Sequence, residues 1–186
     1  MRKELVSWAE VQAMVGDLCQ QIVVDDWRPD YVVGITRGGN IPATMISHYF
    51  DVRCEALKIS LRDQDGVGSE TNTWMSEDAF GYVLTEEQAT IGSRWDPHYR
   101  KNILIVDDIN DTGATFNWLM DDWQASCFPK EQDVWDVVWG KTTRFAVLQD
   151  NLASDFRLKV NYAAQEIDKT YDPVWIDYPW ESWWER

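Results

Sequence analysis

The sequence predicts an α/β fold, in which a twisted and mostly parallel sheet is flanked by helices. Short apolar runs that are typical of strands alternate with stretches whose apolar residues recur every three or four positions, as in amphipathic helices. The run at 103–106 is apolar throughout, which is typical of a central strand covered on both faces. Two loops, 36–39 and 107–115, each follow a predicted strand, and in parallel sheets such loops meet at the edge where ligands bind.

The first sixty residues contain two predicted helices and two predicted strands. The first helix begins with a capping box, because the side chains of Ser7 and Glu10 are spaced to accept hydrogen bonds from each other's backbone amides. The second helix carries Pro42 in its first turn, where no backbone amide is needed. The predicted elements are a helix over 8–24, a strand over 31–35, a helix over 41–50 and a strand over 56–61.

The segment 62–101 differs in character from the rest of the chain. It is polar, contains several glycines and has few apolar repeats, so we expect a long flexible loop of the kind that often acts as a lid. The elements predicted after it are a strand over 103–106, a helix over about 114–125, a strand over 144–148 and extended pieces at 159–163 and 174–178. No linker or repeat divides the chain, so we expect a single domain over 1–186, with its core at about 28–150.

The charge and the hydropathy pattern exclude several classes of protein. The chain has 17 Lys and Arg against 32 Asp and Glu, a net charge of −15. Such a surface repels phosphate backbones and anionic lipid, so we expect no nucleic-acid partner and no membrane partner. The apolar runs are too short to cross a bilayer, and the first residues lack the apolar stretch of a secretory signal. We therefore expect a cytoplasmic protein, with Cys19, Cys54 and Cys127 reduced.

The stretch 107–115 has the features of a site for a sugar phosphate. Asp107 and Asp108 end an apolar strand, and the turn at 111–115 opens a helix. The amides of a helix N-terminus, with two threonine hydroxyls beside them, can bind a phosphate, and Gly113 lets the backbone approach it closely. The paired acids suit a sugar diol, or Mg²⁺ that bridges a diol and a diphosphate. The structural alternative is an aspartate that only caps the helix.

These motifs resemble those of type I phosphoribosyltransferases. The stretch Val106–Thr115 is similar to the signature that binds phosphoribosyl diphosphate (PRPP), and 33–39 resembles the family's pyrophosphate loop. The stretch 174–181 looks like the hood of the bacterial and archaeal-type xanthine-guanine and hypoxanthine enzymes, so that about 151–186 would form a small C-terminal hood. The similarity extends over about 28–181.

The resemblance implies a Mg²⁺-dependent enzyme of purine salvage. Such an enzyme transfers the 5-phosphoribosyl group from PRPP to a purine base (hypoxanthine, guanine or xanthine) and releases pyrophosphate. Its partners would be PRPP, the base and the nucleotide product. By the same resemblance we expect a homodimer or homotetramer, and the apolar tail with Trp180, Trp183 and Trp184 suggests burial of these side chains in an interface.

The resemblance also assigns residues to each part of PRPP and to the metal. The pyrophosphate would be bound by Arg37, Gly38 and Gly39, and the ribose by Asp107 and Asp108. The 5′-phosphate would be bound by Thr112, Gly113, Ala114 and Thr115. Asp108 and Glu181 would bind Mg²⁺. A basic residue of the flexible loop would reach the pyrophosphate, and Arg62, Arg94 and Arg100 are the candidates.

Asp111 is the catalytic residue by the same resemblance, since it would face N7 of the base and stabilise or accept its proton. Trp175 would stack on the purine, and the backbone of Ile176 would read its exocyclic edge.

The base site departs from the family's pattern at one position. Purine enzymes of the family usually carry a lysine just after the strand that is here 144–148, and this lysine reads the 6-oxo group. Asn151 stands in its place, and an amide can donate a hydrogen bond but lacks the charge. Lys141 and Lys159 are nearby in sequence and are possible substitutes.

Three functions remain open at this point. Arg37, Asp111 and Trp175 favour the purine enzyme, because a binding protein needs neither a clamp for a leaving group nor an acid at the base. The absence of the usual lysine favours the alternative, a non-catalytic regulatory protein that binds PRPP or a nucleotide. A phosphoribosyltransferase for adenine, orotate or uracil is a third possibility, and the hood motif argues against it.

Overall fold

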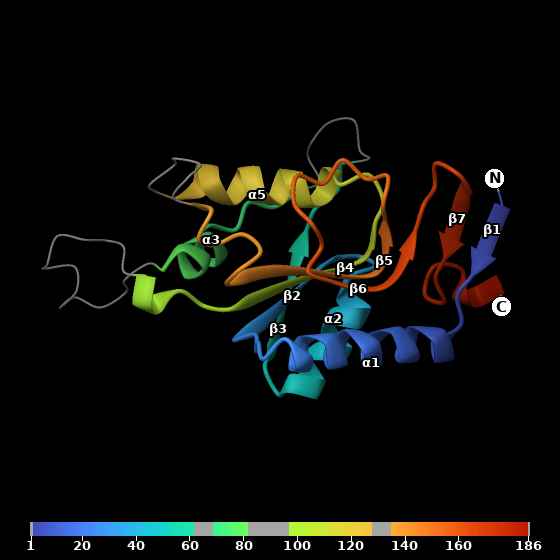
Figure 1. Ribbon diagram of the computed structural model, residues 1–186, viewed down its shortest axis with the longest axis horizontal. Coiled ribbons are helices and arrows are strands. Elements are labelled where there is room, and N and C mark those ends of the chain that lie inside the picture. Colours follow the sequence, from blue (N-terminus) through green and yellow to red (C-terminus); the bar gives the residue numbers. More distant parts are fainter. Residues whose placement is uncertain (1, 62–68, 82–96, 128–134, 186) are drawn as a thin grey trace, which may run out of the picture.

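The computed structural model describes residues 2–61, 69–81, 97–127 and 135–185. Figure 1 shows an α/β arrangement, in which helices lie on both faces of a central five-stranded sheet. Helices α1 (Trp8–Val24) and α2 (Asn40–Phe50) cover one face, and α3 (Thr73–Phe80) and α5 (Ala114–Ser126) cover the other. The predicted fold class is confirmed.

The central sheet is parallel throughout, with the strand order β3-β2-β4-β5-β6. Its strands are β2 (Tyr31–Thr36), β3 (Arg53–Lys58), β4 (Ile103–Asn110), β5 (Thr143–Asn151) and β6 (Tyr162–Ile167). After β2 the chain turns to one face through α2, and after β4 it turns to the other face through α5. The carboxyl ends of β2 and β4 therefore meet at a topological switch point, where ligands bind in open α/β sheets.

A second sheet of two parallel strands lies at one end of the molecule. It pairs β1 (Arg2–Leu5) with β7 (Val174–Asp177), and both chain termini lie at this end in Figure 1. The sequence predicted the strand at 174–178 but not β1. Strand β1 is short and mostly exposed, so its residues show no apolar alternation; its partner strand, far along the chain, defines it.

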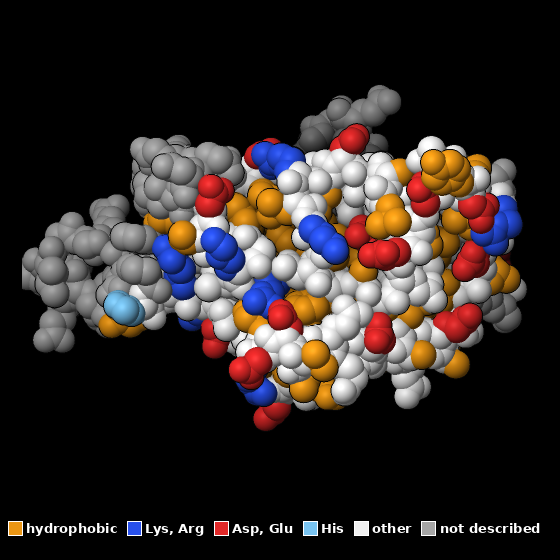
Figure 2. All heavy atoms as spheres, in the orientation of Figure 1, with side chains coloured by type: hydrophobic (Ala, Val, Ile, Leu, Met, Phe, Trp, Pro, Cys, Tyr) orange, Lys and Arg blue, Asp and Glu red, His pale blue; other side chains and the backbone are white. Residues whose placement is uncertain are grey.

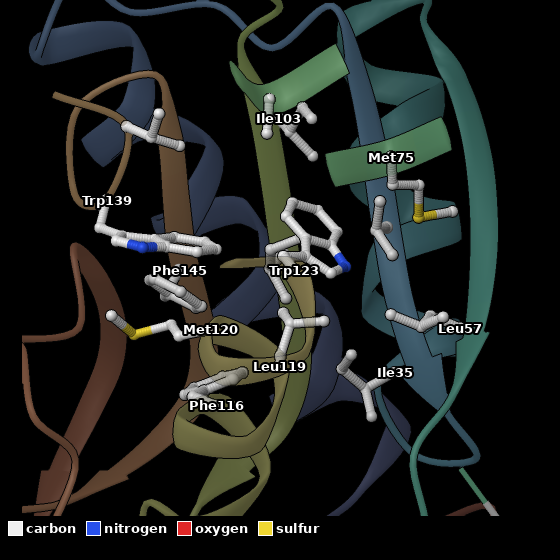
Figure 3. Packing of buried hydrophobic residues seen from close by; sticks show 14 of the residues in the cluster. Ile35, Leu57, Met75, Ile103, Phe116, Leu119, Met120, Trp123, Trp139 and Phe145 are labelled. Carbon is white, nitrogen blue, oxygen red and sulfur yellow. The ribbon is translucent and has the colours of Figure 1, made fainter. Parts of the chain in front are cut away.

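The core consists of two clusters, one on each face of the central sheet. Successive residues of β4 point to opposite faces, so Ile103 and Ile105 join one cluster and Leu104 and Val106 join the other. The cluster under α5 is rich in aromatic side chains, and Figure 3 shows Trp123 and other side chains of α5 packed over the sheet. Trp123, Trp135 and Trp139 are therefore core residues, whereas Trp8, Trp74, Trp175, Trp183 and Trp184 are exposed.

The sequence suggested one long loop over 62–101, but the structure shows that this prediction was wrong in part. The segment contains α3 and a short 3₁₀ helix at Pro97–Tyr99. Met75, Ala79 and Phe80 of α3 are buried in the aromatic cluster. A helix of two turns has too few apolar positions to show a clear period in the sequence. The remaining parts of the expected loop, 62–68 and 82–96, lie outside the described residues.

Four strands differ from the prediction by more than one residue, whereas β2 and β7 differ by a single residue. The alternating pattern suggested 56–61 for β3, but this edge strand begins three residues earlier. Strands β4 and β5 continue beyond 106 and 148 because their polar last residues still pair in the ladder, as Asn110 does with Asp150. Strand β6 begins at Tyr162 rather than 159 and runs on to Ile167. That last shift changes which residues reach the ligand-binding edge.

The surface reflects the acidic composition. Figure 2 shows basic side chains mostly over the left and central part of one face, whereas acidic side chains predominate toward the end with β1 and β7.

In the part of the chain that the structure describes, no helix is long and apolar enough to cross a membrane. The three cysteines are free thiols, as expected, and burial raises the pKa of Cys19 to about 11.

Candidate active site

The loops that follow β2 and β4 lie directly against each other. A methyl group on Gly38 would lie 1.8 Å from Asp108 Oδ2, and one on Gly39 would lie 2.3 Å from the carbonyl oxygen of Val106. Only glycine leaves room for the loop backbone at these two positions. The predicted pyrophosphate loop and the paired acids are thus in contact, and Arg37 lies beside them with an exposed side chain. The peptide bond between Thr36 and Arg37 is cis.

The two acids of β4 are partly buried and ordered by the backbone. Asp107 Oδ1 accepts a hydrogen bond from the amide of Asp108 at 2.9 Å, and Asp108 Oδ1 accepts one from the amide of Ile109 at 2.9 Å. The Tyr178 hydroxyl lies within donating distance of two acceptors, Asp108 O at 3.0 Å and Gln149 Oε1 at 2.8 Å. Residues after β7 therefore reach the ends of β4 and β5.

The negative charges of four acids at the site affect the buried Tyr178. Its pKa is raised well above the ordinary value, first by burial and then by the negative charges of Asp108, Asp107, Glu181 and Asp111. Sequence reasoning missed Tyr178 because an aromatic residue among many carries no motif of its own. Its place three residues after the exposed Trp175 and next to Asp177 was the available signal.

The helix start after β4 is arranged as an anion site would be. Gly113 has a φ of 82° and caps α5, and the amide of Ala114 donates to Thr112 Oγ1 at 3.3 Å. A methyl group on Gly113 would lie 2.2 Å from the amide nitrogen of Phe156, so the turn is packed from behind. The first turn of α5 contains no acidic side chain, and Thr115 is half-buried within it. No carboxylate of this first turn therefore competes for the positive end of the helix dipole.

Asp111 forms an ion pair that the sequence did not suggest. Its Oδ1 lies 2.7 Å from Nζ of Lys169, which is in the turn between β6 and β7. The Lys169 side chain is 18% exposed and that of Asp111 is 38% exposed. The prediction ended β6 at 163, so its true carboxyl end, and with it Lys169, fell outside the expected ligand-binding edge.

Asn151 connects the segments around this ion pair. Its Nδ2 donates to the carbonyl oxygen of Asp111 at 2.7 Å, and its Oδ1 accepts from the amides of Lys169 at 3.1 Å and Ala153 at 3.2 Å. The residue is buried. Both ends of the amide that was expected to read the base are thus engaged by the backbone.

Three basic residues that we named as candidates from the sequence lie away from the carboxyl ends of the strands, where the site is. Lys141 precedes β5 and Lys159 precedes β6, so both are at the amino ends of the strands. The nine residues of β5 span roughly 26 Å, which no lysine side chain can bridge. Arg100 also lies at an amino end, before β4, where its Nε donates to the carbonyl oxygen of Phe80 at 3.1 Å. Arg62 and Arg94 lie outside the described residues.

The hood residues belong to β7 and to the turn after it. Trp175 pairs with Lys3 in the β1–β7 ladder and its side chain is 44% exposed, while Ile176 is buried. The amide of Glu181 donates to the carbonyl oxygen of Tyr178 at 3.0 Å. Trp180 is partly buried within the chain, its ring centroid 4.8 Å from that of Tyr178, and its expected place in an interface between subunits stays a prediction.

The oxygen ligands at the site fit Mg²⁺ only together with a substrate. Among the described residues, no group of three or more His, Cys, Asp or Glu side chains could hold a metal by itself. Mg²⁺ at diphosphate sites generally takes one or two protein carboxylates and completes its shell with phosphate oxygens and water. The site offers such carboxylates in Asp107, Asp108 and Glu181, whose negative charges all raise the pKa of Tyr178. The chemistry of the side chains is compatible with a metal that arrives with a diphosphate.

Comparison with known proteins identifies the family. A model of the phosphoribosyl transferase domain matches residues 1–164. Xanthine phosphoribosyltransferase 1 of Saccharomyces cerevisiae is 21% identical, over 95% of this chain and 88% of that protein. A purine phosphoribosyltransferase from Pyrococcus horikoshii superposes with a TM-score of 0.63 at 20% identity, covering 98% of this chain and 95% of that one.

A third relative agrees in fold. The Helicobacter pylori xanthine-guanine-hypoxanthine phosphoribosyltransferase superposes with a TM-score of 0.62 at 19% identity, covering 99% of this chain and 97% of that one. The expectation of a phosphoribosyltransferase enzyme is thereby confirmed at the level of the family. With the signature at the end of β4 and the parallel sheet that supports it, the chain belongs to the phosphoribosyl transferase family, in its type I branch.

Proposed function

We propose that this enzyme transfers the 5-phosphoribosyl group of PRPP to a 6-oxopurine, hypoxanthine, guanine or xanthine, in purine salvage in the cytoplasm. One observation carries the proposal: a glycine-lined loop, a pair of acids and a helix start without acids meet at a single switch point. These three features suit a diphosphate, a ribose diol and a 5′-phosphate, respectively. The names of the relatives support purines as acceptors.

In this proposal three segments bind PRPP. Arg37 and the amides of Gly38 and Gly39 hold the diphosphate that will leave. Asp107 and Asp108 accept hydrogen bonds from the ribose hydroxyls. The backbone amides at 112–115 and the threonine hydroxyls among them hold the 5′-phosphate.

The transfer itself exchanges one bond at C1 of the ribose for another. A ring nitrogen of the purine forms the new bond to C1 while the bond from C1 to the diphosphate oxygen breaks, and its electron pair leaves with the diphosphate. Positive charge builds on the ribose, close to the carboxylates of Asp107 and Asp108, which stabilise it. Asp111 accepts the proton that the purine loses from N7. Asp108 and Glu181 would hold Mg²⁺ together with PRPP, and the metal would supply neutralising charge for the diphosphate.

The base is held by the hood. Trp175, with its exposed side chain, stacks on the purine, and the backbone of Ile176 reads the exocyclic edge. Burial of the base between the hood and Asp111 excludes water from C1, which protects PRPP from hydrolysis.

The test is pyrophosphate release from PRPP and Mg²⁺, with hypoxanthine, guanine, xanthine and adenine offered in turn. We expect release with at least one 6-oxopurine and none without a base. If no base supports release while PRPP still raises the Tm, the protein is a PRPP-binding regulatory protein rather than an enzyme. Release with adenine alone would contradict the assigned substrate class.

We also propose that the protein forms a homodimer or homotetramer. Trp183 and Trp184 are 66% and 65% exposed, at the end of the molecule that also carries the exposed Trp8. Exposed apolar side chains that lie next to each other often mark a surface that another protein covers. Light scattering after size-exclusion chromatography gives the mass directly, and a monomer of 21.7 kDa would refute the proposal.

A further inference from the structure

The base end of the site contains a cation that none of the recognised motifs supplies. Lys169 comes from the turn after β6, and its Nζ lies 2.7 Å from Oδ1 of Asp111. Its side chain is mostly buried, although a lysine that only balanced surface charge would extend into water. A buried ammonium next to the proposed catalytic carboxylate calls for a chemical role.

The turn that carries Lys169 is held in place by hydrogen bonds. Asp168 organises it, since its Oδ1 accepts from the amide of Thr170 at 2.9 Å and its carbonyl oxygen accepts from the amide of Asp172 at 3.1 Å. The amide of Leu152 donates to the carbonyl oxygen of Ile167 at 2.8 Å, which fixes the end of β6 beside the end of β5. The backbone that delivers the ammonium is therefore set before any ligand binds.

Asn151 positions both members of the ion pair. It donates to the backbone of Asp111 and accepts from the backbone of Lys169, so one buried amide joins the two segments. The resemblance implies a base-reading lysine at position 151. Asn151 instead joins two segments here, and an ammonium comes from the turn after β6, the neighbouring strand.

We propose that Lys169 reads the 6-oxo group of the purine and so determines the base specificity of this enzyme. The inference rests on the proposed function and deepens it. A 6-oxopurine presents a proton at N7 and an acceptor at O6 along one edge. A carboxylate and an ammonium at hydrogen-bonding distance from each other match that edge, with Asp111 at N7 and Lys169 at O6.

The same pair rejects a 6-aminopurine. An exocyclic amino group donates hydrogen bonds, and an ammonium has only donors, so adenine would leave both groups without an acceptor in a site closed to water. A site built to hydrogen-bond one group discriminates strongly against an analogue that lacks it. Lys169 is thus expected to act on the choice of base and not on PRPP.

The experiment compares Lys169→Met, which keeps the length of the side chain but removes its charge, with the parent enzyme. We expect KM for the preferred 6-oxopurine to rise about tenfold to a hundredfold, as for a lost hydrogen bond to a charged group, with KM for PRPP nearly unchanged. The preference for 6-oxopurines over adenine should fall by a similar factor. Lys159→Met, an exposed lysine at the amino end of β6, is the matched control and should change neither value.

A binding measurement keeps the inference separate from the proposed function. Calorimetry of parent and Lys169→Met with the 5′-monophosphates of hypoxanthine and of adenine needs no turnover. If the parent releases no pyrophosphate with any base, the proposed function fails, and the ratio of the two nucleotide affinities still tests Lys169. If Lys169→Met leaves both that ratio and the KM for the base unchanged, the inference is wrong. A variant that loses kcat equally for all bases would show that Lys169 only neutralises Asp111, which also overturns it.

Discussion

Two lysine–aspartate ion pairs have the same length but opposite burial. Lys3 Nζ lies 2.7 Å from Asp177 Oδ2 in the β1–β7 sheet, and Lys169 Nζ lies 2.7 Å from Asp111 Oδ1 at the site. In the first pair the lysine is 53% exposed and the acid 3% exposed. In the second pair the lysine is 18% exposed and the acid 38% exposed.

The difference separates a structural pair from a functional one. Asp177 is buried at the end of β7, and Lys3 reaches it from the paired strand, so this contact fastens the two strands together. At the site the buried partner is the cation, and the acid is the more exposed partner, so a ligand can reach the acid and take over the interaction. Breaking the first pair should therefore cost stability, and breaking the second should cost catalysis or binding.

A third pair shows that burial alone does not make a site. Arg144 is also 18% exposed and pairs with the 53% exposed Asp25, but its guanidinium lies 4.8 Å from the ring centroid of Trp27 and 5.8 Å from that of Tyr162. The cation is covered by aromatic rings at the amino end of β5. What distinguishes Lys169 is its place at the carboxyl ends of the strands.

The largest effect is expected for Asp111→Asn. An amide keeps the shape but cannot accept the N7 proton, so kcat should fall roughly 10²–10⁴-fold. The Tm should stay close to that of the parent, because Asp111 is partly exposed. Asp177→Asn, measured in the same way, should lower the Tm. Comparable loss of Tm in both variants would mean that the two pairs do not differ in role.

The next largest effect is expected for Lys3→Met, and it should appear in stability. Removing one partner of a pair whose acid is buried costs about 1–3 kcal/mol of unfolding free energy here, less than for a fully buried pair because Lys3 is half exposed. Urea denaturation measures this value. Arg2→Met is the control on the same strand, since the Arg2–Asp172 pair is exposed on both sides and should contribute little.

A smaller effect is expected for Tyr178→Phe, which tests the link between the two regions. The variant loses the hydroxyl that lies near Asp108 O and Gln149 Oε1, which should cost about 1–2 kcal/mol of stability. Because Asp108 is also proposed to bind the ribose, KM for PRPP should rise a few-fold. If stability falls with no change in KM for PRPP, the hydroxyl only supports the fold.

The smallest effect is expected from acid titration of the Asp25 pair. Hydrogen bonds from Tyr162 and then Arg144 lower the pKa of Asp25 below its ordinary value of 3.8. An acid with a lowered folded pKa stabilises the protein above its unfolded pKa, and this stabilisation is lost as the pH falls through the folded value. Asp25→Asn should therefore be slightly less stable than the parent at pH 6, and the difference should shrink toward pH 3. A difference independent of pH would point to packing instead.

Much of the fold could be predicted because it depends on local patterns. The capping box at Ser7 and Glu10 is present, and the helix begins at Trp8 and ends at Val24 as predicted. The apolar run at 103–106 lies in the central strand. In contrast, α3 was missed because its burial depends on contacts with a distant cluster, and β1 because its pairing partner is β7.

The amino-acid sequence by itself determined the α/β class, the order of most elements and the segment that carries the PRPP signature, because periodicity and short motifs are properties of neighbouring residues. Tertiary structure alone decided which charges share the site. Lys169, Asp111 and Asn151 come from the ends of three strands, and the register of β6 against β5 brings them together. A one-dimensional pattern cannot show that contact, since it is created when parallel strands align their carboxyl ends.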